Sequence, residues 1–79
     1  MKITGTSSYI RVELHNRSVK IQGEQLVGGF LAYSDSIANW EPPYDDVGID
    51  EQTKKELIQA VIEKTKNSHF QIKFDDRTF

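Results

Sequence analysis

The eight residues Asn39–Asp46, NWEPPYDD, limit the fold of this chain more than any other stretch. Pro43 fixes its own backbone φ and restricts the conformation of Pro42 before it, and neither proline has an N–H to donate. Neither a helix nor a central strand can therefore absorb this stretch. We expect a stiff, irregular connector here.

The chain before this connector alternates between apolar and polar residues with period two, which is typical of half-buried strands. The alternation over residues 8–15, a turn at His15–Ser18 and its renewal at Val19 and Ile21 predict a β-hairpin. Residues 2–4 predict a short leading strand, residues 25–33 a further apolar strand, and residues 36–40 one more short strand. Within residues 25–33, the Gly28–Gly29 pair marks a bulge or a place where another segment passes close.

The chain after the connector predicts one helix and one final strand. Asp50 is typical of an N-cap, and the helix is expected from residue 51 to about residue 66. Its apolar stripe is expected to consist of Leu57, Ile58, Val61, Ile62 and Thr65. The final strand is expected over residues 69–75, with three inward side chains: Phe70, Ile72 and Phe74.

These elements predict an α+β domain that spans residues 1–79. An antiparallel sheet of four to six strands would carry the helix on one face, because a single helix can cover only one face. The other face would be polar and would carry Tyr9, Arg11, Glu13, Lys20, Gln22 and Lys73. A chain of this length buries only about 60–65% of its unfolded surface, which leaves little room for a deep catalytic cavity. Function is therefore expected on the surface.

The composition excludes several kinds of site. There is no cysteine, so disulfides, thiolate metal sites and a cysteine nucleophile are excluded. The only histidines, His15 and His69, are too few for a typical histidine metal site, and no catalytic motif surrounds them. Asp45, Asp46 and Asp50 lack the spacing of a calcium loop. We expect no catalysis, metal or cofactor.

No apolar run reaches the roughly 18–20 residues that cross a bilayer, and the first five residues do not resemble a signal peptide. We expect a cytoplasmic protein that does not contact membranes.

The charge of the chain is unevenly distributed. Residues 34–53 hold six acids and no lysine or arginine, so this segment carries −6 against +4 for the remainder. Such a segment disfavours nucleic-acid binding and suits docking to a basic protein, although a solvated loop has the same composition. The di-proline would pre-organise the side chains mounted on it. We expect a buried Trp40 beside exposed neighbours, and we predict six partner-binding residues: Asp35, Trp40, Glu41, Tyr44, Asp45 and Asp46.

The segments KITGTSSYIRVE, IQGEQLVGGFLAY, SIANWEPPYDD and IDEQTKKELIQAVIEKTKNS, with FQIKF after them, resemble a known family. This is immunity protein 74, one of the small bacterial immunity proteins of polymorphic toxin and contact-dependent growth inhibition systems. The resemblance covers nearly the whole chain and is most specific at Trp40–Tyr44. It implies a non-catalytic cytoplasmic domain that binds one cognate toxin, and such toxins are frequently nucleases with basic clefts. It transfers no contact residue.

The leading hypothesis is therefore an immunity protein whose acidic segment binds and neutralises a cognate toxin. An alternative is a non-catalytic intracellular interaction or regulatory module that binds a host peptide or protein, for example by adding a strand to an exposed sheet edge. A nucleic-acid-binding domain that uses Tyr9, Arg11, Lys20 and Lys73 is disfavoured by the acidic centre.

Overall fold

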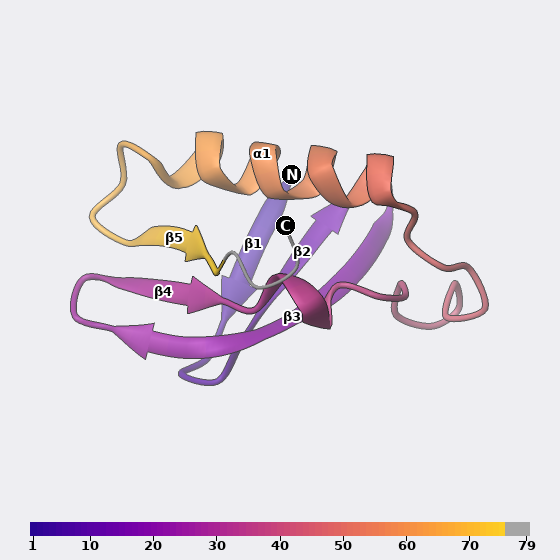
Figure 1. The fold of residues 1–79 in the computed structure, drawn as a ribbon, viewed down its shortest axis with the longest axis horizontal. Helices are drawn as coiled ribbons and strands as arrows, with labels where there is room; N and C mark the ends of the chain where they lie inside the picture. Colours follow the sequence, from indigo (N-terminus) through magenta and orange to yellow (C-terminus); the bar gives the residue numbers. More distant parts are fainter. Residues whose placement is uncertain (76–79) are drawn as a thin grey trace.

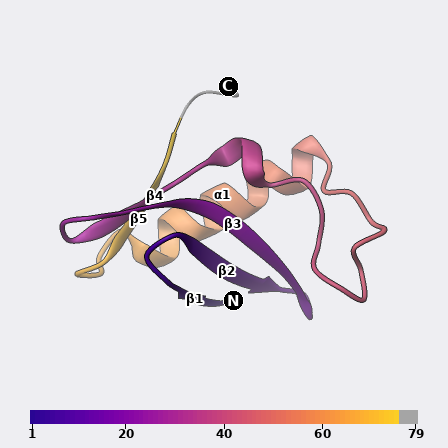
Figure 2. The same cartoon turned by 90° about the horizontal axis from the view of Figure 1, so that it is seen from below.

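A computed structural model describes residues 1–75 of the chain, and Figure 1 shows a curled β-sheet with a helix lying across it. Its elements in chain order are β1 (Lys2–Gly5), β2 (Tyr9–Leu14), β3 (Arg17–Leu26), β4 (Gly29–Ala32), the 3-10 helix η1 (Ser34–Ser36), α1 (Glu51–Thr65) and β5 (Gln71–Phe74). Figure 2 shows the same two layers from below, with α1 on one side of the sheet. The predicted α+β class, with one helix on one face and a final strand after it, is confirmed.

The sheet has five strands in the order β1-β2-β3-β4-β5. The first three pairings are antiparallel, but β4 and β5 are parallel, so the sheet is mixed where an antiparallel one was predicted. The reason is the connection between them. The chain leaves β4, passes through α1 and returns to the same edge, and such a crossover brings the next strand back in the same direction.

The β2–β3 hairpin follows the predicted alternation. Its turn is shorter than expected, because only His15 and Asn16 lie between the strands, with φ of 53° and 64°. Two successive residues in the left-handed region are typical of the tight turns that match the twist of paired strands. Ile10 pairs with Ile21 and Val12 pairs with Val19, and all four side chains are buried.

Residues 25–33 form the end of one strand and the whole of another, and the single strand predicted there is wrong. β3 ends at Leu26, the chain turns, and β4 starts at Gly29. Gly28 has φ of +76°, which glycine adopts without strain. At Gly29 a Cβ atom would lie 2.5 Å from the carbonyl oxygen of Gln71. The close approach of another segment was therefore correctly predicted at Gly29, while the bulge was not.

The short strand predicted over residues 36–40 is absent. The chain forms η1 and then an irregular loop, in which Asn39 makes an isolated bridge with Gly48. Ser36 explains the change, because its hydroxyl donates to the carbonyl oxygen of Tyr33 at 2.7 Å and accepts from the N–H of Gln22 at 3.0 Å. Local hydrogen bonds of this kind favour a turn over an extended ladder.

The helix lies close to its predicted bounds. The carboxylate of Asp50 accepts from the N–H of Thr53 at 2.7 Å, which confirms the predicted N-cap. The buried face contains Lys54, Leu57, Ile58, Val61 and Thr65. Ile62 was expected in this stripe but is 37% exposed. Lys54 lies outside the predicted stripe but is only 8% exposed.

The segment after the helix differs from the prediction at one aromatic residue. Ile72 is buried in β5 and Phe74 is half-buried, but Phe70 precedes the strand and is 41% exposed, so its predicted place as an inward strand residue of the core is wrong. The hydroxyl of Ser68 accepts from the N–H of Phe70 at 2.9 Å and donates to its carbonyl oxygen at 3.1 Å. This tight turn holds Phe70 outside the ladder.

Candidate protein-interaction surface

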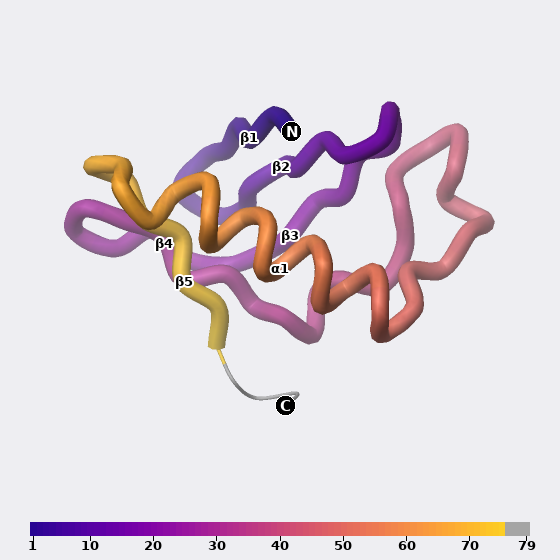
Figure 3. Tube along the Cα trace, turned by 90° about the horizontal axis from the view of Figure 1, so that it is seen from above, coloured from indigo at the N-terminus to yellow at the C-terminus, as the bar shows by residue number. Residues whose placement is uncertain are grey.

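The connector between η1 and α1 projects beyond the end of the sheet, as Figures 1 and 3 show. Trp40 is only 6% exposed and belongs to the hydrophobic core, together with Ile37 on the same segment. Beyond Trp40 the Pro42–Pro43 peptide bond is cis and the chain returns through two turns. In these turns Tyr44 N–H donates to the carbonyl oxygen of Glu41, and Val47 N–H donates to that of Tyr44, both at 3.0 Å.

The predicted division of this segment, a buried Trp40 beside exposed neighbours, agrees with the structure except at Glu41. Trp40 is buried, Tyr44, Asp45 and Asp46 are exposed, and Glu41 is half-buried. We call residues 41–47 the connector turn.

Backbone hydrogen bonds hold the base of the connector turn in place. Glu41 N–H donates to the carbonyl oxygen of Ser18 in β3 at 2.8 Å, and Ile49 N–H donates to that of Ala38 at 2.8 Å. A segment anchored at both ends loses little conformational entropy when a partner binds it. The connector turn is therefore irregular in shape but fixed in position.

Glu41 is also held by a side chain of the sheet. Arg11 donates from Nε to Oε1 of Glu41 at 2.7 Å and from Nη2 to Oε2 at 3.1 Å. This bidentate geometry aligns the guanidinium with the carboxylate. The hydrogen bond to Glu41, and then its charge, raise the pKa of Arg11 above its ordinary value. Both side chains remain partly exposed, so we expect the pair to orient Glu41 more than to stabilise the fold.

Arg17 contacts the connector on the other side of the hairpin. Its guanidinium lies 4.7 Å from the ring centre of Tyr44 and 6.0 Å from that of Trp40. Arg17 has the strand parity of the inward residues, whereas Arg11 has the outward parity. The connector turn thus contacts arginines from both faces of the β2–β3 hairpin.

The outer face of the sheet also carries contacts between cations and an aromatic ring. Tyr9 lies between two cations: the Lys20 ammonium is 4.3 Å from its ring centre and the Arg11 guanidinium is 5.8 Å away. Arg11 therefore contacts both Tyr9 and Glu41, and it joins the outer sheet face to the connector turn. Sequence analysis missed both arginine contacts, because alternation places a residue on a face but does not indicate which distant loop packs against it.

The predicted acidic residues do not form one group. Asp45 and Asp46 lie together on the connector turn, and within residues 1–75 no lysine or arginine forms a salt bridge with either. Asp35 is exposed in η1, which Figures 1 and 3 show well apart from the connector turn. Asp50 caps α1, and its hydrogen bonds from Thr53 lower its pKa below the ordinary value.

Two other properties bear on the kind of site present. Over residues 1–75, no cluster of three or more histidine, aspartate or glutamate side chains is arranged to hold a metal ion. In the same part of the chain, no helix is long and apolar enough to cross a membrane. The features gathered here are those of a recognition surface: exposed carboxylates, a tyrosine and arginines on a fixed backbone.

A comparison with protein families matches residues 2–75 to immunity protein 74. The chain belongs to this family. The resemblance noted in the sequence is thereby confirmed, and it covers nearly the whole chain. The searches of curated proteins and of solved structures each found no match. Membership supports a protein that acts by binding a cognate toxin, and immunity proteins of this kind are generally non-catalytic.

Proposed function

We propose that this immunity protein neutralises a basic, nuclease-type toxin in the cytoplasm by binding it through the connector turn. The contact residues would be Glu41, Tyr44, Asp45 and Asp46, with Trp40 fixing their position from the core. One observation carries the proposal: Asp45 and Asp46 are exposed on a segment anchored to the sheet, without a lysine or arginine partner within residues 1–75.

The four contact residues would act differently. Asp45 and Asp46 would attract a basic toxin over a distance and speed its association. Tyr44 offers an aromatic ring already oriented by Arg17, so little rotamer entropy is lost when a partner covers it. Glu41 is held in one orientation by Arg11 and is half-buried, so its own contribution would be smaller than that of the exposed Asp46.

Asp35 would have a different role from the connector turn. Because η1 lies apart from this turn, Asp35 would contribute to long-range attraction, and a single toxin contact need not cover both. Trp40 would act from beneath the surface as a support.

The test is binding to the toxin domain encoded directly upstream of the gene for this protein. We expect the Asp45→Lys, Asp46→Lys double variant to weaken binding by at least about 100-fold, since each charge reversal replaces an attraction by a repulsion. Raising the salt concentration should weaken wild-type binding and reduce the difference in affinity between the wild type and the double variant. Glu24→Lys is the matched control, because Glu24 is exposed on β3 away from the connector turn. Equal affinities of the double variant and the control would overturn the proposal.

An intracellular module that binds a host peptide is the second candidate, and it is favoured by the outer edge of β1, which no other strand of residues 1–75 covers. The gene neighbourhood separates the two functions. An immunity protein should be encoded next to a toxin gene whose product it binds, whereas a host-peptide module need not be.

A further inference from the structure

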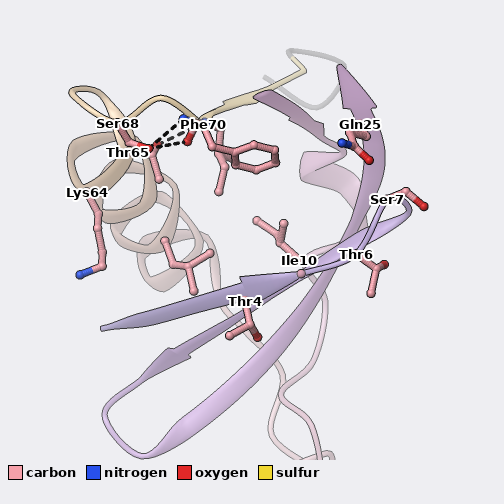
Figure 4. A pocket seen from close by; sticks show the side chains of 12 residues that line it. Thr4, Thr6, Ser7, Ile10, Gln25, Lys64, Thr65, Ser68 and Phe70 are labelled. Atoms are coloured by element: carbon pink, nitrogen blue, oxygen red, sulfur yellow. Dashed lines mark hydrogen bonds between the residues drawn. The ribbon is translucent and has the colours of Figure 1, made fainter. Parts of the chain in front are cut away.

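A second surface lies at the other end of α1, away from the connector turn. A cavity of about 550 Å³ opens between β1, the β1–β2 turn and the C-terminal end of the helix, as Figure 4 shows. Ile3, Ile10 and Ile72 supply its apolar wall, and the exposed ring of Phe70 extends over it. An aromatic ring left 41% exposed beside a cavity with an apolar wall is a common anchor for a partner.

The cavity adjoins an unpaired strand edge. β1 pairs only with β2, so its other side is open within residues 1–75. Thr6 N–H donates to the carbonyl oxygen of Tyr9 at 2.8 Å, which sets the alternation of the ladder. Because antiparallel pairs alternate, Thr4 and Lys2 direct their backbone groups toward β2, whereas Ile3 and Gly5 direct theirs outward.

The edge at β5 is different, because the protein closes it with its own helix. Gln71 N–H donates to the carbonyl oxygen of Gly28, just before β4, and Asp75 N–H donates to that of Ala32 in β4. The N–H of Ile72 between them therefore points away from the sheet. That N–H donates to Oγ1 of Thr65 at 3.2 Å, and the same hydroxyl donates to the carbonyl oxygen of Val61 at 2.9 Å. No hydroxyl of α1 is bonded in this way to β1.

The side-chain geometry joins the open edge to the cavity. Residues opposite each other on neighbouring strands point to the same face. A residue paired with Ile3 or Gly5 would therefore point toward α1 and into the cavity. Gly5 leaves room for it and is itself constrained to be small, since a Cβ there would lie 2.8 Å from the carbonyl oxygen of Tyr9.

The charge at the cavity indicates what its occupant should carry. Among the described residues, Lys64 is the one charged residue that lines the cavity, and none of them is an acid that lines it. Within residues 1–75, Lys64 has no salt-bridge partner. Lys2, on β1, also has no salt-bridge partner in this part of the chain.

We propose that an extended segment of the toxin adds to the edge of β1 and inserts a large apolar side chain beside Phe70, with a carboxylate close to Lys64. This inference rests on the proposed function, since it assigns the segment to the same toxin. The segment would hydrogen-bond to the outward groups of Ile3 and Gly5, and strand addition of this kind gives affinity through the main chain and specificity through the pocket.

The test compares Ile3→Pro with Ile3→Val in binding to the toxin domain encoded upstream. Proline removes the outward N–H but no hydrogen bond to β2, whereas valine keeps that N–H. We expect about a tenfold or greater loss of affinity for Ile3→Pro and less than about threefold for Ile3→Val. Amide hydrogen exchange should show the Ile3 and Gly5 N–H groups protected in the complex only.

Two exposed-site variants keep the test decisive if Ile3→Pro does not fold. Phe70→Ala should weaken binding by about tenfold, and Lys64→Glu by several-fold, because the first removes the aromatic anchor and the second reverses the attracting charge. Unchanged affinity for these variants, with no protection at Ile3 and Gly5, would overturn the inference. A stable dimer of the protein that pairs through β1 in the presence of toxin would do the same.

The results separate this inference from the proposed function. If reversal of Asp45 and Asp46 weakens binding and the β1 variants do not, the connector surface stands and strand addition fails. If the β1 variants weaken binding and the acid reversals do not, strand addition stands and the connector surface fails.

Discussion

The two ends of α1 present contrasting surfaces. At the N-terminal end, the connector turn is acidic and held by arginines on both sides of the β2–β3 hairpin. At the C-terminal end, the β1 edge and its cavity are mainly apolar, hold a lysine and have open backbone groups. The first surface is suited to attracting and orienting a charged partner, and the second is suited to holding it by desolvation and main-chain hydrogen bonds.

This difference shows how a small domain can divide recognition between two surfaces. The connector turn contains the uncommon Trp40–Tyr44 run, but its tryptophan is in the core. Part of that run therefore has a structural role in supporting the surface. Only its exposed residues are available to a partner. The β1 end has no unusual sequence run, and its features arise from strand order and from an exposed phenylalanine.

The largest expected effect separates the two aromatic residues of these ends. Trp40→Ala should lower the free energy of unfolding by about 3–5 kcal/mol, because it leaves a cavity in the core where the connector is anchored. Phe70→Ala should change it by less than about 1 kcal/mol, because that ring is substantially exposed. Urea unfolding of both variants measures the two values. Equal losses would show that the two ends are not anchored differently.

The next effect concerns the two sheet edges. Thr65→Val should lower the free energy of unfolding by about 1–3 kcal/mol, since it removes the buried acceptor for the Ile72 N–H. Thr4→Val is the matched control, because Thr4 lies on the exposed edge strand and its hydroxyl makes no hydrogen bond within residues 1–75. Thermal unfolding and amide exchange at Ile72 measure the difference. Equal stability and equal amide exchange at Ile72 in the two variants would mean that the helix does not cover the edge of β5.

A smaller effect is expected from the Arg11–Glu41 pair. Arg11→Gln should leave stability almost unchanged, because both side chains are partly exposed, but it should free the Glu41 carboxylate to pivot. We then expect toxin affinity to fall by about threefold, since the contact is less ordered before binding. Lys20→Gln, which also neutralises a cation beside Tyr9, is the control. A gain in affinity for Arg11→Gln would show that the pair competes with the toxin.

The smallest effect is the pH dependence of the stability that the Asp50 cap gives to α1. Because the pKa of Asp50 is lowered in the folded protein, its contribution is fully present above the ordinary aspartate value of 3.8 and is lost as pH falls through the folded pKa. The thermal midpoint of Asp50→Ala should therefore lie below that of wild type at neutral pH. The gap between the two midpoints should narrow as the pH falls below 3.8. A gap that widens on acidification would contradict the assigned cap.

Local patterns predicted much of this fold. Alternation identified the β2–β3 strands and the inward position of Ile72, and the cap at Asp50 located the helix. The turn at Gly28 was missed, because a Gly-Gly pair inside an apolar run is compatible with a bulge in one strand and with a hairpin turn between two strands. The parallel pairing of β5 was missed because strand order depends on where the chain returns after the helix.

The candidate surface was predicted less completely. Composition and the prolines indicated the exposed Tyr44, Asp45 and Asp46 beside a buried Trp40. The contacts of Arg11 and Arg17 with the connector span 30 and 27 residues of sequence, so no local pattern reports them. Alternation predicted that Phe70 points inward from the final strand. The hydrogen bonds of the Ser68 hydroxyl instead hold Phe70 in a turn before β5, with its ring at the cavity.

The most direct measurement is a nitrogen-15 NMR titration of the whole protein with the toxin domain encoded upstream. We expect the amide signals of Tyr44, Asp45 and Asp46 to shift on binding, together with those of Ile3 and Gly5 at the β1 edge. The signals of the solvent-facing residues of α1, such as Lys55 and Gln59, should stay in place. Shifts confined to the outer face of α1, with the connector turn unchanged, would contradict the account.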